Sequence, residues 1–278
     1  MRRRVTLATS FLLCLAAAAA AVVSAQEPPR TVTITVGPRS VSVAGAENLP
    51  AGPTRIEIRG NPRVEGFLAA FRPGRTLEEL QRALPRASRG PGPLKPIITF
   101  EATGAPERGG VYATTIDLRP GVTYVAANVP ERVRNARFAT FTAGTTPTTA
   151  VRPTPAATVG IYDYAYGMAS VMPRSGVVRF ENRGERLHLA VAAPVRRGVN
   201  RTRAVRELLS RREPRFNRFF DGRRSFEALG VVSPGTVNDV EVNFPRRGNW
   251  VFVCFVQDGE PGNPPHFSIG MVKAFRVR

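Results

Sequence analysis

The chain has 278 residues and a formal net charge of +19, with 25 glycines, 25 prolines, two cysteines and two histidines. This length predicts one or two domains, and the Gly, Pro, Val and Thr content with few long helical patterns favours an all-β class. The basic charge suits anionic lipid, cell-wall polymer or an acidic redox partner, or it reflects a solvated arginine-rich surface. Nucleic acid is not an expected partner, because no recognisable binding motif is present.

Residues 1–25 predict a secretory signal. Three arginines at positions 2–4 precede an apolar run from Leu7 to Val23, and small residues follow at the expected cleavage site. The run is short for a membrane span, so we expect no stable span after cleavage and a secreted, periplasmic or cell-envelope location. Cleavage leaves a charge of +16 and Cys254 as the only cysteine, which excludes a disulfide within the mature chain.

The first half, residues 31–143, predicts a β-sandwich domain. Thr31–Val36 alternates as a half-buried strand does. Thr76–Leu84 predicts a short amphipathic helix, with Thr76 and Glu79 forming a capping box and Pro85 ending it. The Gly/Pro-rich residues 87–96 are expected to form a loop. Further strands are expected at residues 40–43, 54–58, 67–71, 112–118, 122–128 and 137–142.

A Thr/Pro-rich segment, residues 144–158, has no apolar period and predicts an extended linker between two domains. The second half, residues 159–278, repeats the order of the first. Its expected elements are strands at residues 159–164, 176–181, 187–192 and 237–244, a helix at 203–211 and a terminal hairpin from 248.

The two halves are interpreted as an internal duplication. The alignment places Tyr124 under Trp250, Asn128 under Cys254, and residues 137–143 under residues 271–277. The first copy contains no Cys, His or Met, so it cannot hold a soft metal ion.

The last thirty residues bring together Cys254, His266 and Met271. A thiol, an imidazole and a thioether suit a soft, redox-active metal such as copper. Strand alternation points Cys254 to the same side as Trp250 and Phe252, whose rings would keep a bound metal dry.

The fourth candidate ligand is His188, the other histidine of the chain, at an expected strand start. Two histidines, a cysteine and a methionine form the set described for blue-copper sites. Each residue alone also has a structural interpretation: Cys254 as a buried thiol, His188 as a hydrogen-bonded strand residue and Met271 as core packing.

Residues 172–278 resemble a cupredoxin of the plastocyanin or azurin type. The resemblance rests on Gly248-x-Trp250-x-Phe252-x-Cys254, on Pro265-His266-x-x-x-Gly270-Met271-Val272, and on Phe180-x-Asn182 leading to His188. It implies a type 1 copper site held by His188, Cys254, His266 and Met271, with His266 as an exposed electron port. We therefore expect an all-β chain of two tandem Greek-key, cupredoxin-like sandwiches, each with a short inserted helix. Eleven residues separate Cys254 from His266, more than in small blue-copper proteins.

The expected function is outer-sphere electron transfer by an exported copper protein that is not an enzyme. With both histidines assigned to the metal, a Ser-His-Asp triad has no free base, and neither a phosphate-binding loop nor CxxC zinc spacing occurs. An acidic redox protein or an anionic envelope surface would be the partner. Two alternatives stay open: a copper storage or delivery protein with the same ligands, and a non-catalytic envelope-binding module on this scaffold.

Overall fold

The computed structural model describes residues 27–106, 110–129, 135–210, 216–258 and 263–278. The secretory signal expected at residues 1–25 lies outside this range. Within the range, the chain is mostly strand, as the composition predicts, and no helix is long and apolar enough to cross a membrane.

The first half contributes eight strands and a short helix in the predicted position. They are β1 (Arg30–Gly37), β2 (Ser40–Ala44), β3 (Gly52–Gly60), β4 (Glu65–Phe71), α1 (Leu77–Ala83), η1 (Leu84–Arg89), η2 (Gly92–Leu94), β5 (Ile98–Gly104), β6 (Tyr112–Leu118), β7 (Thr123–Val129) and β8 (Phe138–Thr142). The capping box predicted for α1 is present, with Thr76 and Glu79 each bonded to the other's backbone N–H.

The second half repeats this order with a larger helical insertion. Its elements are β9 (Ala157–Tyr162), β10 (Ala165–Gly167), β11 (Val171–Met172), β12 (Ser175–Asn182), β13 (His188–Pro194), α2 (Arg201–Ser210), α3 (Phe216–Phe219), η4 (Gly222–Arg224), β14 (Phe226–Val232), β15 (Val237–Asn243), β16 (Gly248–Val253), η5 (His266–Ile269) and β17 (Val272–Val277).

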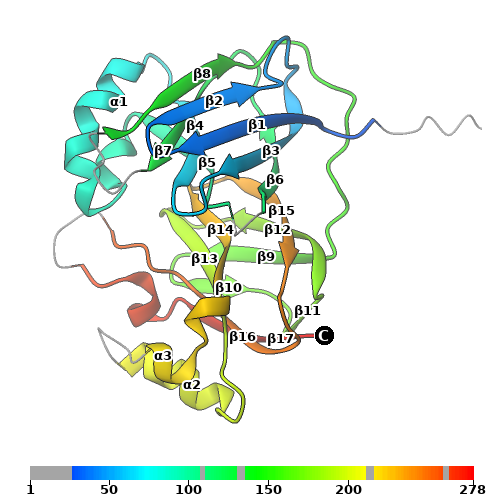
Figure 1. Ribbon diagram of the computed structural model, residues 1–278, viewed down its shortest axis with the longest axis vertical. Coiled ribbons are helices and arrows are strands. Elements are labelled where there is room, and N and C mark those ends of the chain that lie inside the picture. The colour runs from blue at the N-terminus through cyan, green and yellow to red at the C-terminus, as the bar shows by residue number, and fades with distance from the viewer. Residues whose placement is uncertain (1–26, 107–109, 130–134, 211–215, 259–262) are drawn as a thin grey trace, which may run out of the picture.

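One eight-stranded sheet runs through both halves in the order β10-β9-β12-β15-β6-β3-β1-β2. A sheet of order β5-β4-β7-β8 completes the sandwich of the first half, and one of order β11-β17-β16-β13-β14 completes that of the second. Figure 1 shows the two sandwiches end to end, with β6 and β15 between them. The all-β arrangement of two sandwiches is therefore confirmed.

The two halves share one strand order, which agrees with the predicted internal duplication. Reading outward from the β6–β15 junction, β6-β3-β1-β2 matches β15-β12-β9-β10, and β5-β4-β7-β8 matches β14-β13-β16-β17. The register also agrees. The Asn128 N–H donates to the Arg137 carbonyl at 3.3 Å, and the Cys254 N–H donates to the Met271 carbonyl at the same distance.

Two strands that the pattern did not predict, β5 and β14, occupy the same place in each copy. They lie against each other: the Ser233 N–H donates to the Phe100 carbonyl, and the Thr103 hydroxyl donates to the Val231 carbonyl. Gly230 is required here, because a Cβ atom would lie 1.9 Å from the Thr103 carbonyl oxygen. Most residues of β5 and β14 are buried or half-buried on both faces, so their sequences lack the alternation of apolar and polar residues that identifies a half-buried strand.

The junction of the two sandwiches is a short antiparallel pairing held by a buried charge. Strands β6 and β15 pair through Asp239 with Thr115 and Val240 with Thr114. The Asp239 carboxylate is 0% exposed and accepts from both Arg152 and Arg179 at 2.7 Å. A buried carboxylate is tolerated when its charge is paired in this way.

The segment expected to be a linker, residues 144–158, supplies Arg152 to this junction. Its guanidinium also donates to the carbonyls of Thr115 on β6 and Val237 on β15 and pairs with Asp117. The contacts of Arg152 fix the segment along the shared sheet, and its last residues, Ala157 and Thr158, already belong to β9.

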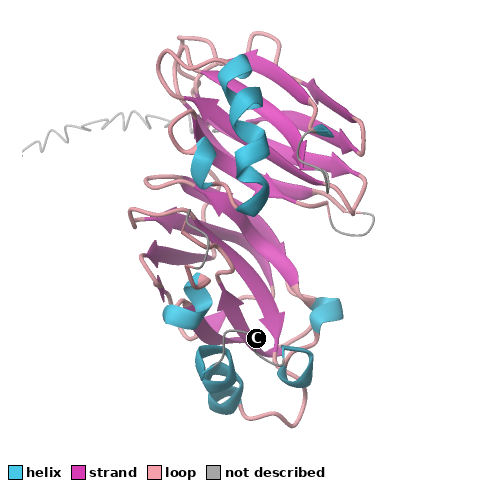
Figure 2. Ribbon diagram, turned by 90° about the vertical axis from the view of Figure 1, so that its left-hand side faces the viewer, coloured by secondary structure: helices cyan, strands magenta, loops and turns pink. Residues whose placement is uncertain are grey.

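The helical insertion of the second half covers the outer face of the β13-β16-β17 sheet. Ala204, Leu208 and the neighbouring Phe219 and Phe220 form a second hydrophobic cluster with Val251 and Val253. Figure 2 shows these helices outside the strands, at the end of the molecule away from the first half.

We expect Asp239→Asn to destabilise the protein by about 3–5 kcal/mol, because two arginines would then face a neutral amide at a buried site. Urea unfolding followed by circular dichroism measures this. Asp117→Asn is the matched control: this carboxylate is 54% exposed and shares Arg152, so its loss should cost less than about 1 kcal/mol. Equal losses for the two variants would contradict the buried pairing.

Candidate metal centre

Three of the four predicted ligands meet at one end of the second sandwich. His188 begins β13, Cys254 follows β16, and His266 begins η5. One candidate ligand atom from each residue lies within 4.8 Å of the other two, and all three side chains are buried. Cys254 Sγ lies 3.5 Å from His266 Nδ1, which lies 3.2 Å from His188 Nδ1.

These distances fit donors that share one small cation. Metal–nitrogen and metal–sulfur bonds of about 2.0–2.3 Å, at angles of roughly 105–120°, place neighbouring donor atoms about 3.2–3.7 Å apart. Two imidazole nitrogens and a thiolate are ligands that copper binds well. The residues present therefore fit a type 1 copper ion.

Met271, the fourth predicted ligand, is buried beside this group. Its N–H donates to the His266 carbonyl, and its own carbonyl accepts from the Cys254 N–H. Backbone hydrogen bonds thus tie Met271 to two candidate ligands. Its assignment as the axial ligand remains a prediction.

The outer nitrogen of each imidazole faces a carboxylate. His188 Nε2 lies 3.1 Å from Asp163 Oδ1, and His266 Nε2 lies 3.2 Å from Asp258 Oδ1. The His266 contact has ion-pair distance without the alignment of a straight hydrogen bond. Carboxylates beside both Nε2 atoms favour the proton there, which leaves two Nδ1 lone pairs facing each other. That arrangement is repulsive unless a cation lies between the two Nδ1 atoms.

Burial sets the protonation state of the candidate ligands. Burial lowers the pKa of His188 to about 4, despite the raising effect of Asp163, so its imidazole is neutral near pH 7. Burial likewise lowers the pKa of His266, against the opposing effect of Asp258. Burial raises the pKa of the Cys254 thiol to about 11, so an incoming cation must displace its proton.

Aromatic side chains form a dry wall behind the thiol. As the strand alternation predicts, Trp250, Phe252 and Cys254 belong to the main core, whereas Val251 and Val253 face the helices. The Phe252 ring contacts those of Phe180, Tyr166 and Phe275. The site is therefore shielded from water on this side.

The turn between β9 and β10 is the part of the site that sequence reasoning missed. Asp163 contacts His188, the edge of the Tyr164 ring lies against His266 with centroids 5.1 Å apart, and Tyr166 donates to the Leu189 carbonyl at 2.5 Å. Tyr164 adopts φ +65°, a conformation rare for residues other than glycine. Tyr162, Tyr164 and Tyr166 alternate in the sequence, but alternation alone indicates only a shared sheet face.

The long segment between Cys254 and His266 carries a second missed residue, Asp258. The Asp258 Oδ2 atom accepts from the Tyr164 hydroxyl at 3.1 Å and from the Arg186 guanidinium at 2.5 Å. Burial alone would raise the pKa of this carboxyl, but His266, Tyr164 and Arg186 together hold it below its ordinary value. Asp258 is therefore an anchored anion beside His266.

The expected exposure of His266 is wrong. Its side chain is 0% exposed, because Tyr164, Asp258 and Arg186 lie over it, with the Arg186 guanidinium 5.5 Å from the centre of the Tyr164 ring. The motif resemblance placed the imidazole correctly, but this cover comes from the β9–β10 turn and the long loop.

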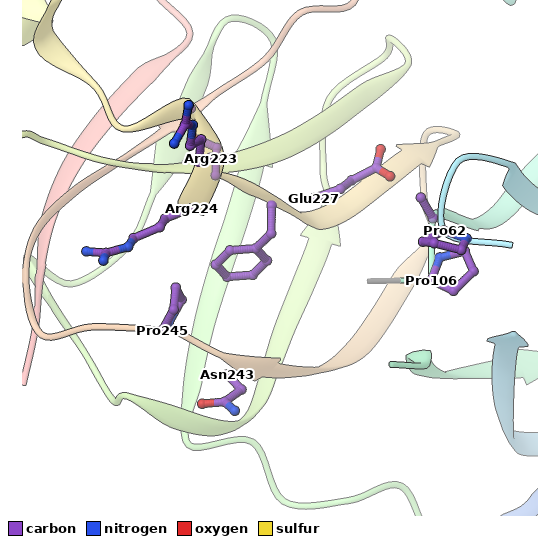
Figure 3. A pocket seen from close by; sticks show the side chains of 11 residues that line it. Pro62, Pro106, Arg223, Arg224, Glu227, Asn243 and Pro245 are labelled. Carbon is purple, nitrogen blue, oxygen red and sulfur yellow. The ribbon is translucent and has the colours of Figure 1, made fainter. Parts of the chain in front are cut away.

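A cavity of about 970 Å³ is lined by residues of both sandwiches. Arg223 and Arg224 lie at one end and Glu227 at the other, near Pro62 and Pro106 of the first half (Figure 3). None of its lining residues belongs to the His–Cys group, so it is separate from the candidate metal centre.

No family model and no curated protein matches the chain. Solved structures do. An auracyanin from Roseiflexus castenholzii is 20% identical, with TM-score 0.27, over 45% of this chain and 99% of its own. Auracyanin A, a "blue" copper protein from Chloroflexus aurantiacus, is 16% identical, with TM-score 0.25, over 44% and 98%. A blue copper oxidase from Nitrosomonas europaea is 13% identical, with TM-score 0.23, over 90% and 85%. These similarities carry no argument about the chemistry, which rests on the geometry above.

We expect Tyr164→Ala to increase the rate at which diethyl pyrocarbonate modifies His266 several-fold, because the substitution removes the ring that covers the imidazole. Peptide mass spectrometry of the apo-protein measures the rate. Tyr162→Ala is the control, since the Tyr162 phenol is 41% exposed and accepts from Arg183 instead. Rapid labelling of His266 in the unaltered protein would contradict its burial.

Proposed function

We propose that this protein binds one copper ion at His188, Cys254, His266 and Met271 and carries single electrons by outer-sphere transfer. The observation that carries the proposal is the pair of buried imidazoles with facing Nδ1 atoms 3.2 Å apart beside the Cys254 thiol. A cation relieves the repulsion between these lone pairs and is the natural counter-ion of the thiolate.

Each residue has a defined part in this role. His188 and His266 supply neutral nitrogen donors, and Cys254 supplies a thiolate whose proton leaves on loading. Met271 would supply a thioether sulfur as the fourth, weak donor. Bound copper supplies a one-electron couple. The packed strands β13, β16 and β17 hold the donors in nearly one geometry for both oxidation states, which keeps reorganisation small.

Electron transfer suits this site better than catalysis on a bound substrate. The donor set comes entirely from the protein, and in the part of the chain that the structure describes all four donor residues are buried beneath Tyr164, Asp258 and the aromatic wall. Both histidines of the chain belong to this one group, so a second imidazole-based copper centre is not available. Outer-sphere transfer needs neither an open coordination position nor a second metal.

Export and an anionic partner complete the proposal. The leader-like residues 1–25 support export, and the charge of +16 on the remaining chain supports association with an acidic redox protein or an anionic envelope surface. Because such attraction is screened by salt, association should weaken as ionic strength rises.

The test is to add Cu(II) to purified apo-protein and record the visible spectrum. We expect an intense thiolate-to-copper band at one equivalent, absent in Cys254→Ser. Met271→Leu should shift the band and raise the reduction potential. Met172→Leu should change neither, because Met172 is equally buried but pairs with Val277 at the opposite end of β17.

Three outcomes separate the candidates. A stable band that bleaches and returns through reduction and oxidation supports electron transfer. A band with rapid metal exchange to a chelator points instead to storage or delivery. If the protein shows no band and takes up no copper tightly, copper binding is overturned and the scaffold is left as a binding module.

A further inference from the structure

We propose that Asp163 and Asp258 are positioning residues that hold both imidazoles by their outer nitrogens and bias the centre toward Cu(II). This inference rests on the proposed copper function and deepens it. The carboxylates approach from two different segments, the β9–β10 turn and the loop after Cys254, yet each meets the outer nitrogen of one histidine at 3.1–3.2 Å.

The two carboxylate oxygens of Asp258 have different partners. Its Oδ2 atom accepts from the Tyr164 hydroxyl and the Arg186 guanidinium, and its Oδ1 atom lies 3.2 Å from His266 Nε2. The Arg186 guanidinium also stacks over the Tyr164 ring, so these three side chains brace one another. A carboxylate fixed in this way restricts rotation of the imidazole that it contacts.

Asp163 is fixed by the backbone. Its Oδ1 atom accepts from the Glu185 N–H at 3.0 Å and lies 3.1 Å from His188 Nε2. Glu185 lies three residues before His188, which begins β13. The backbone that holds the Asp163 carboxylate therefore adjoins the strand that holds the imidazole. The turn that carries Asp163 also carries Tyr164, whose hydroxyl donates to Asp258. Asp163, Tyr164 and Asp258 thus form one connected layer over the two imidazoles, which we call the cover.

The two carboxylates have a chemical consequence beyond position. A proton held at each Nε2 makes Nδ1 the donor atom, and the partial negative charge passed to the ring makes that donor more basic. Two nearby anions stabilise a divalent ion more than a monovalent one, since the Coulomb energy scales with the charge. The cover should therefore favour Cu(II) over Cu(I) and lower the reduction potential.

The inference also explains the eleven residues between Cys254 and His266. The loop closes on itself through a bridge between Gln257 and Pro265, and the Asn263 side chain donates to the Asp258 carbonyl at 2.5 Å. This closure returns Asp258 to the imidazole of His266. A shorter connection would bring His266 to Cys254 without providing a place for this carboxylate.

The experiment compares Asp163→Asn, Asp258→Asn and the double variant with the unaltered protein, using competition titrations for Cu(II) and for Cu(I). We expect each single variant to bind Cu(II) roughly 10–100-fold more weakly. Cu(I) affinity should fall less, so the reduction potential should rise. Asp258→Glu, which keeps the charge, should restore part of the Cu(II) preference.

Asp117→Asn is the matched control, because it removes an arginine-paired carboxylate at the junction and should leave both affinities unchanged. Equal losses for Cu(II) and Cu(I), together with lower apo-protein stability, would show a merely structural role and overturn the proposal. If Asp258→Asn does not fold, Tyr164→Phe removes one anchor of Asp258 and should shift the potential in the same direction by less.

Failure of this inference is distinguishable from failure of the copper assignment. An unaltered protein that shows the thiolate band, with variants that keep its Cu(II)/Cu(I) preference, overturns the role of the carboxylates alone. An unaltered protein without the band overturns both proposals.

Discussion

The buried carboxylate of Asp239 is the interaction on which the joined structure depends. The pairing of β6 with β15 is too short to hold two sandwiches by backbone hydrogen bonds alone, and two arginines converge on the charge at its centre. The same junction brings β5 against β14, the strand that pairs with His188 through Val232. The first sandwich thus covers an edge strand that would otherwise expose unpaired backbone groups beside the metal centre.

The first copy, which has no Cys, His or Met, closes the same corner with an amide. Asn128, aligned with Cys254, donates from Nδ2 to the Gly37 carbonyl at 2.7 Å and accepts at Oδ1 from the Arg137 N–H at 2.6 Å. Its neutral amide thereby joins β7 to the end of β1 and to the segment before β8. In the second copy a thiol and two imidazoles occupy the equivalent corner, and hydrogen bonds among these groups do not satisfy both Nδ1 atoms. The first copy thus pairs both polar atoms of Asn128, whereas the second leaves an Nδ1 atom without a donor among these three side chains.

Local patterns predicted the parts of this protein that depend on neighbours in sequence. Strand alternation gave the inward direction of Cys254, and the capping box gave the start of α1. The donor types selected the candidate ligands, and the structure brings His188, Cys254 and His266 together. The sequence could not predict the residues that cover the imidazoles, because β10 is only three residues long and Asp163 lies 25 positions from His188 in the chain. Asp258 lies in a loop without hydrophobic periodicity, so its contact with His266 is visible only in the structure.

The loop that departs most from small blue-copper proteins is also what distinguishes this centre. An exposed imidazole edge would give a partner direct contact with a ligand, but here the Tyr164 ring and the Asp258 carboxylate intervene. In the proposed role an electron would cross that layer, which adds distance to the transfer and excludes water. A low-dielectric site strengthens the interaction of each carboxylate with the charge on the metal. The cover and the carboxylates therefore act together, because the Tyr164 hydroxyl that anchors Asp258 and the Tyr164 ring that shields His266 belong to one side chain.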